Sequence, residues 1–112
     1  MQKPWTVTPE KIDAAVQRII QASQPSQVIV FGSAAQKGLR PPRDVDLLVV
    51  TKDDVAHPRH ESVRLRRALR GIAMPIDILV ISARRLREVA DRPGLVYREA
   101  LRHGRVVYEA PA

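Results

Sequence analysis

The sequence contains no cysteine and few aromatic side chains. Without cysteine, disulfide bonds, thiolate catalysis and zinc–thiolate sites are all excluded, and the composition fits a cytoplasmic protein. Because only 4% of the residues are aromatic, platforms for stacking single-stranded nucleic acid are scarce. No apolar run approaches the roughly 20 residues that span a bilayer, and the N-terminus lacks the apolar stretch of a signal peptide. We therefore expect a cytoplasmic protein without a membrane segment.

Acidic residues are in the minority, with 12 against 19 basic residues and a formal net charge of +7. This balance favours anionic partners such as nucleotides, nucleic acid or an acidic protein, although an arginine-rich solvated surface gives the same count. Hydrophobic residues make up 45% of the chain, which is enough for a packed core. At 112 residues, the chain is expected to form one domain over residues 1–112.

Apolar periodicity and helix breakers predict alternating helices and strands. Thr8-Pro9-Glu10 is typical of a helix start, and Gln24-Pro25-Ser26 ends that helix. Ser82 is expected to cap a later helix, and Gly104 to close the last one. Further helices are predicted over residues 61–72, after residue 82 and up to about residue 103, and strands over 27–31, 45–51, 76–81 and 105–109. This order predicts an α/β or α+β sheet domain.

Three aspartates are the first candidates for chemistry. Asp44 and Asp46 stand two residues apart at the mouth of a strand, so both side chains point to one face. Asp77 lies inside an apolar strand, where a carboxylate is costly to bury without a partner. If the two strands are neighbours, the three carboxylates converge and could hold two hard divalent ions such as Mg²⁺. Taken singly, each aspartate could equally be a solvated strand or loop residue.

Gly32-Ser33 forms a second candidate element. It follows the short apolar strand 27–31 and precedes a predicted short helix. Backbone N–H groups and a hydroxyl at such a turn suit phosphate oxygens. It is not a P-loop, because no Gly-Lys-Ser/Thr follows. The alternative is an ordinary strand-to-helix turn with Ser33 as N-cap.

Together, Gly32-Ser33, the ten-residue gap and Asp44-Val45-Asp46 resemble the signature of the DNA polymerase β-like nucleotidyltransferase superfamily, in particular its small MNT-type members. Asp77 falls where that family places its third carboxylate. The resemblance implies a mixed sheet of about four strands flanked by helices. It also implies that Asp44, Asp46 and Asp77 bind two Mg²⁺ ions, with Mn²⁺ as a possible substitute.

The resemblance implies that Gly32 and Ser33 grip the phosphates of a nucleoside triphosphate, with ATP as the expected one. Gln36 and Lys37 stand beside this turn, where the family often carries arginine and glycine. Either Lys37 supplies the missing positive charge, or triphosphate binding is weakened. The expected reaction is attack of an acceptor hydroxyl, on protein or RNA, at the α-phosphorus with release of pyrophosphate.

An alternative function is a binding module, because MNT-type proteins often pair as antitoxins with HEPN-type toxins. A homodimer or a hetero-complex would then supply walls that so small a chain lacks. Two other clusters have plainer interpretations. His57 and His60, with Asp53 and Asp54 nearby, could form an accessory metal site or simply a solvated loop. The arginines at 64, 66, 67 and 70 could contact an anionic partner or form a solvated helix face.

Overall fold

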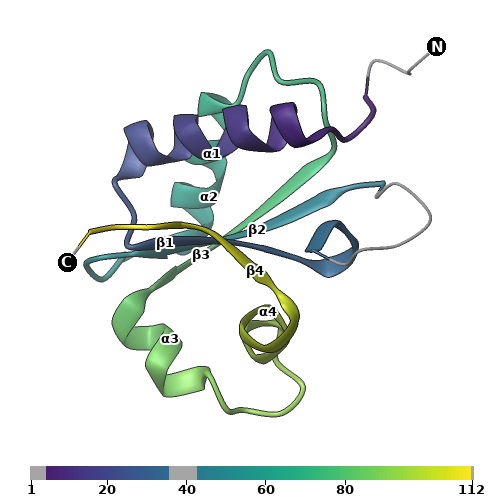
Figure 1. Cartoon of the computed structure of the whole chain (residues 1–112). Coiled ribbons are helices and arrows are strands. Elements are labelled where there is room, and N and C mark those ends of the chain that lie inside the picture. Colours follow the sequence, from purple (N-terminus) through teal and green to yellow (C-terminus); the bar gives the residue numbers. More distant parts are fainter. Residues whose placement is uncertain (1–4, 36–42, 112) are drawn as a thin grey trace.

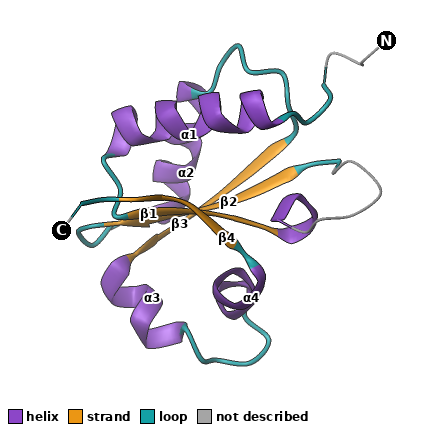
Figure 2. Cartoon of the chain, in the orientation of Figure 1, coloured by secondary structure: helices purple, strands orange, loops and turns teal. Residues whose placement is uncertain are grey.

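A mixed β-sheet runs through the middle of the molecule, with helices on both of its faces (Figures 1 and 2). The computed structural model describes residues 5–35 and 43–111. Its elements are α1 (Pro9–Ser23), β1 (Gln27–Phe31), the 3-10 turn η1 (Gly32–Ala35), β2 (Val45–Thr51), α2 (Pro58–Ala68), β3 (Ile76–Ser82), α3 (Ala83–Val89), α4 (Val96–His103) and β4 (Arg105–Glu109). The predicted α+β class with a four-stranded mixed sheet is confirmed.

The strand order in the sheet is β3-β2-β1-β4. The hairpin-like neighbours β1 and β2 are antiparallel, β4 is antiparallel to β1, and β2 and β3 are parallel. A parallel pair needs a crossover connection, and α2 provides it. Both β3 and β4 are therefore edge strands. Within the described ranges, no helix is long and apolar enough to cross a membrane.

Alternating strand residues build two separate cores. Leu47 and Val49 of β2 face α1 and α2, where Ile19 and Leu65 are completely buried. Leu48 and Val50 face the opposite side, where Leu86 of α3 and Ala100 of α4 cover the sheet. Figure 1 shows α1 and α2 on one side of the strands and α3 and α4 on the other. The continuous apolar run of β2 is explained by this burial on both faces.

The predicted caps and ends were largely correct. The hydroxyl of Thr8 accepts the Lys11 N–H at 3.2 Å, and the hydroxyl of Ser82 accepts the Arg85 N–H at 3.1 Å. The predicted bounds of α2, residues 61–72, were wrong. The helix begins at Pro58 and ends at Ala68. Proline suits the first turn of a helix, where its missing N–H would have no intrahelical acceptor. The helix therefore begins three residues before the predicted start at residue 61.

Gly104 ends α4 by donating its N–H to the carbonyl of Ala100. Its backbone is extended, with φ −79°, so the glycine is not required for a left-handed conformation. Space is the constraint: a Cβ here would meet the Ala100 carbonyl oxygen and would lie 2.8 Å from the Ile29 Cγ2 atom. Only glycine lets the chain turn from α4 into β4 so close to β1.

We expect Gly104→Ala to lower the free energy of unfolding by about 1–3 kcal/mol, because the added methyl group overpacks against backbone. Urea denaturation of the purified chain measures this loss. His103→Ala, at the exposed neighbouring position, is the control and should change stability by no more than about 0.5 kcal/mol. Equal effects of the two substitutions would contradict the steric explanation.

Candidate active site

Strand pairing brings two of the three candidate aspartates side by side. Asp46 of β2 lies in register with Asp77 of the parallel strand β3. Each of the two residues lies near the start of its strand. Asp46 shares a face with Leu48, and Asp77 with Leu79, so the two carboxylates lie on the α3/α4 side of the sheet. The exposed Asp44 precedes β2 by one residue. The sequence left the pairing of β2 and β3 as a condition, and the structure meets it.

The Gly32 turn, at the end of β1, lies against the carboxylate of Asp46. β1 ends at Phe31, whose register partner across the antiparallel pair is Asp46. Gly32 then adopts a left-handed backbone with φ +71°, and a Cβ at this position would lie 2.5 Å from Asp46 Oδ2. The glycine thus allows both the turn and the close approach of Asp46. Ser33, the next residue, is exposed at the start of η1.

Asp46 carries an unfavourable charge in this arrangement. Partial burial raises the pKa of its carboxyl, and the negative charges of Asp44 and Asp77 raise it further. The ionised side chain is therefore destabilised by its surroundings. A bound cation would relieve both effects, since it would neutralise the repulsion and replace lost hydration. Clustered carboxylates that repel one another are the donor set that hard divalent cations use in proteins.

Asp77 differs from its expected environment. Its side chain is 70% exposed rather than buried, because β3 is an edge strand, so burial cost does not explain its presence. Its Oδ1 atom lies 3.3 Å from a guanidinium nitrogen of Arg66 on α2. Sequence reasoning missed this pair, because Arg66 belongs to the arginine-rich helix face and nothing in its spacing points to Asp77. Such an exposed pair is worth roughly 0–1 kcal/mol and exchanges easily.

The three candidate carboxylates are near one another in the sheet but do not form a metal-binding cluster. Over residues 5–35 and 43–111, no three acidic or histidine side chains are grouped tightly enough to hold a metal ion. Asp44, Asp46 and Asp77 fit a divalent cation by their chemistry and by their mutual repulsion, not by a finished geometry. Gln36 and Lys37, the other predicted phosphate contacts, lie outside the described residues.

The remaining predicted clusters have local partners. The rings of His57 and His60 lie with their centroids 4.9 Å apart, while Asp54 pairs with Arg84 rather than with a histidine. On the arginine face, Arg64 donates to the Ala22 carbonyl at 3.0 Å and also pairs with Glu61. Two of the four arginines, Arg64 and Arg66, therefore connect α2 to neighbouring elements.

These features define the class of the protein. The Gly32-Ser33 turn follows β1, Asp44 and Asp46 lie at the start of the antiparallel strand β2, and Asp77 lies on the parallel strand β3. The sequence profile of the family described as Polymerase beta, Nucleotidyltransferase matches residues 14–111. The chain therefore belongs to this family and is a nucleotidyltransferase. Family membership implies a nucleoside triphosphate as substrate and transfer of its nucleoside monophosphate.

Comparison of structures agrees on the fold. A crystal structure from Sulfolobus solfataricus, provisionally named a nucleotidyltransferase, superimposes with a TM-score of 0.61 at 18% sequence identity. The match covers 89% of this chain and 78% of that one. At this identity the likeness shows a shared fold and no more. No curated protein matches this chain by sequence.

We expect Asp46→Asn to stabilise the metal-free protein. Because the pKa of Asp46 is higher in the folded than in the unfolded state, stability falls as the pH rises from its ordinary value of 3.8 through the raised folded value. Asparagine removes this loss, so at pH 7 with a chelator Asp46→Asn should unfold at a higher Tm than wild type.

The gain should vanish when the same melts are recorded below the ordinary carboxyl range, where Asp46 is protonated in both states. Asp91→Asn, at an exposed site outside the cluster, is the matched control and should leave Tm unchanged. A loss of stability in Asp46→Asn at pH 7 would show that the carboxylate is not held under repulsion.

We further expect Gly32→Ala to destabilise the protein through two separable effects. The left-handed backbone costs about 1–2 kcal/mol for alanine, and the clash with Asp46 adds to it. Gly94→Ala isolates the first effect, because Gly94 has φ +80° with open space around its Cβ position. Denaturant titration should show a larger loss for Gly32→Ala, and the excess should shrink in an Asp46→Ala background. Equal losses at both glycines would disprove the contact.

Proposed function

We propose that this chain is a minimal, MNT-type nucleotidyltransferase that transfers AMP from ATP to a hydroxyl group on a protein or RNA acceptor. The observation that supports it is the position of Asp46, which lies near the start of β2 between the Gly32 turn and Asp77. In the reaction, the acceptor oxygen forms a bond to the α-phosphorus and the bond to the β-phosphate oxygen breaks. Pyrophosphate leaves, and the proton of the acceptor hydroxyl passes to solvent water.

The Gly32 turn is the proposed phosphate site. Its backbone N–H groups and the exposed Ser33 hydroxyl are proposed to donate to the β- and γ-phosphates. Gln36 and Lys37, which follow directly in the sequence, are proposed to flank these phosphates. The left-handed conformation of Gly32 brings this turn against Asp46, so the triphosphate would lie beside the carboxylates.

Asp44, Asp46 and Asp77 are the proposed ligands of two Mg²⁺ ions, or of Mn²⁺ in their place. When bound, the ions supply charge neutralisation on the phosphate oxygens and lower the pKa of the acceptor hydroxyl. Asp77 is held by Arg66 in the free protein, and exchange of this exposed pair would release its carboxylate toward Asp46. The three carboxylates thereby orient the acceptor oxygen in line with the α-phosphorus.

The acceptor is proposed to come from a partner, either a HEPN-type protein, an RNA or a second copy of this chain. The described residues form one small sheet with four helices, and the carboxylates lie at one end of it, near the starts of β2 and β3. A partner covering that end would exclude water and position the acceptor hydroxyl.

We expect Asp44→Asn and Asp46→Asn each to lower nucleotidyl transfer roughly 10²–10⁴-fold, by loss of metal and charge stabilisation. Asp77→Asn should keep the fold and also impair turnover. The assay uses Mg²⁺, each of the four α-labelled nucleoside triphosphates and either co-purified protein or RNA as acceptor. Asp91→Asn serves as the control with unchanged activity.

A second measurement reports on binding without turnover. Tm should rise when Mg²⁺ and ATP are added together, by an amount that follows ligand concentration. Lack of transfer with every triphosphate and acceptor, with tight partner binding retained in Asp44→Asn and Asp46→Asn, would instead establish a docking-only antitoxin. Unfolding of Asp77→Asn would assign Asp77 a structural role.

A further inference from the structure

The outer face of α2 is exposed and strongly basic. It consists of five residues that recur at intervals of three and four, on one side of the helix and of the turn that continues it, namely Arg59, Val63, Arg66, Arg67 and Arg70. All five are exposed, whereas Leu65 and Leu69 on the opposite side are buried in the core. The outer face therefore presents four arginines to solvent.

Most of the positive charge on the outer face has no local counter-charge. Within the part of the chain that the structure describes, the guanidinium groups of Arg59, Arg67 and Arg70 make no ion pair or hydrogen bond. Arg66 makes one, the exposed pair with Asp77 at 3.3 Å. Three uncompensated charges are thus spread along roughly 16 Å, at the rise of about 1.5 Å per helical residue.

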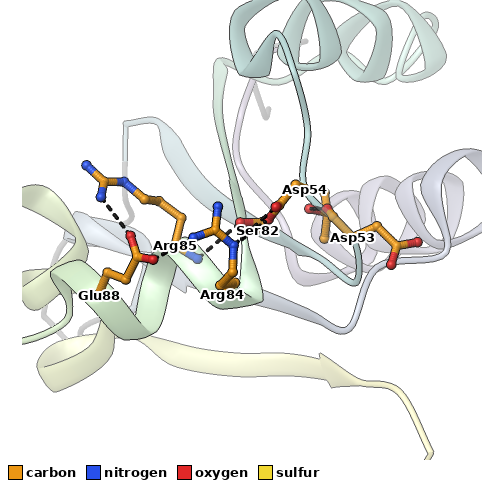
Figure 3. Close-up of polar contacts among 7 residues, drawn as sticks. Asp53, Asp54, Ser82, Arg84, Arg85 and Glu88 are labelled. Atoms are coloured by element: carbon orange, nitrogen blue, oxygen red, sulfur yellow. Dashed lines mark hydrogen bonds and ion pairs between the residues drawn. The ribbon is translucent and has the colours of Figure 1, made fainter.

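The arginines of α3 are different, because two of the three are neutralised. Arg84 lies between the carboxylates of Asp54 and Glu88, at 3.1 and 2.6 Å (Figure 3). Arg85 pairs with Glu88 at 2.8 Å. A polyanion is therefore attracted to α2 more strongly than to α3.

The outer face leads to the carboxylates of the candidate active site. Arg66 reaches the Oδ1 atom of Asp77, and the hydroxyl of Ser62 donates to the carbonyl of Ile78 at 2.6 Å, so α2 lies along β3. Asp77 lies in register with Asp46 on the neighbouring strand. A chain bound along the arginines therefore passes beside the carboxylates.

The chemistry of the outer face fits a phosphodiester backbone. The planar guanidinium group presents its donors in a fork that matches phosphate oxygens. Protein interfaces instead have an apolar centre from which charged residues are depleted. The outer face has the reverse composition, with the half-exposed Val63 as its single apolar side chain. Aromatic residues are only 4% of the sequence, so bases have few side chains on which to stack.

From these observations we infer that the outer face of α2 binds the phosphate backbone of a single-stranded RNA. The arginines hold the strand through its phosphates and do not read its bases. Arg66 exchanges Asp77 for a phosphate when the strand binds. The role of this RNA as the acceptor rests on the proposed function, since its ribose hydroxyls are the groups that the transfer requires. The binding itself does not rest on it.

The probe is a short fluorescein-labelled oligouridylate, which has no stable base pairing of its own. Fluorescence anisotropy measures its binding to the full chain with a chelator and without nucleotide, so no transfer takes place. We expect log Kd to rise with log salt concentration at a slope of about 2, because each of three phosphate contacts contributes about 0.7 on a single strand.

Arg59→Gln and Arg67→Gln should each lower this slope by about 0.7 and weaken binding about 5-fold near 0.1 M salt. Arg87→Gln is the matched control, because it removes the same charge from an exposed site on α3. It should leave the slope unchanged. Circular dichroism confirms that the three variants fold.

Asp77→Asn should act in the opposite direction, because it frees Arg66 to contact a further phosphate. We expect binding to be about 2–5-fold tighter, the range of an exposed ion pair, and the salt slope to rise. Asp54→Asn makes the same change of charge beside Arg84 on α3 and should leave binding unchanged.

Three results would overturn the inference. Equal losses in Arg59→Gln and Arg87→Gln would show that binding follows net charge and not the outer face. Weaker binding by Asp77→Asn would show that Arg66 does not contact the strand. Tighter binding of an oligoglutamate of equal charge would assign the face to an acidic protein.

A transfer assay separates this inference from the proposed function. With the oligouridylate as acceptor, Arg59→Gln should raise KM for the RNA and leave kcat unchanged, because Arg59 lies away from the carboxylates. Absence of transfer to every acceptor, with RNA still bound through Arg59 and Arg67, would refute the proposed function and support the surface. Transfer that persists while RNA binding ignores these arginines would do the reverse.

Discussion

The central strand β2 pairs with one antiparallel and one parallel neighbour, and the candidate site depends on both pairings. Its antiparallel pairing with β1 brings the Gly32 turn against Asp46, while its parallel pairing with β3 sets Asp77 beside the same residue. A shift of either register by one residue would turn these carboxylates to the opposite face. Burial of β2 in both cores prevents such a shift, since its apolar residues fill both faces completely.

The site concentrates negative charge in a protein that is basic overall. Asp46 is the residue most affected, because partial burial and the neighbouring carboxylates raise its pKa and disfavour its ionised form. Arg66 offsets part of this charge at Asp77 through an exposed pair. Electrostatic repulsion of this kind is typical of functional sites, where a ligand-binding group lowers the stability of the folded protein. The positive net charge then lies elsewhere, mainly on α2 and α3.

Much of the fold could be predicted from local patterns. Thr8 and Ser82 cap their helices as expected, because a side-chain oxygen reaches the third N–H whatever surrounds it. The short β-branched runs became strands. The helix predicted from residue 61 left out Pro58, because proline is compatible with both a loop and a first helical turn, and only packing of α2 on the sheet decides between them. Exposure of Asp77 could not be foreseen, since an apolar run looks the same on a central and on an edge strand.

The sequence by itself determined the residue types of the site and their spacing, because Gly32, Asp44 and Asp46 lie within one strand–turn–strand unit. It also determined the helix caps and the apolar faces, which depend on near neighbours. Only the tertiary structure decided that β3 lies parallel to β2 at the edge of the sheet and that Arg66 reaches Asp77. These relations join residues far apart in the chain, and they follow from how two cores are packed around one sheet.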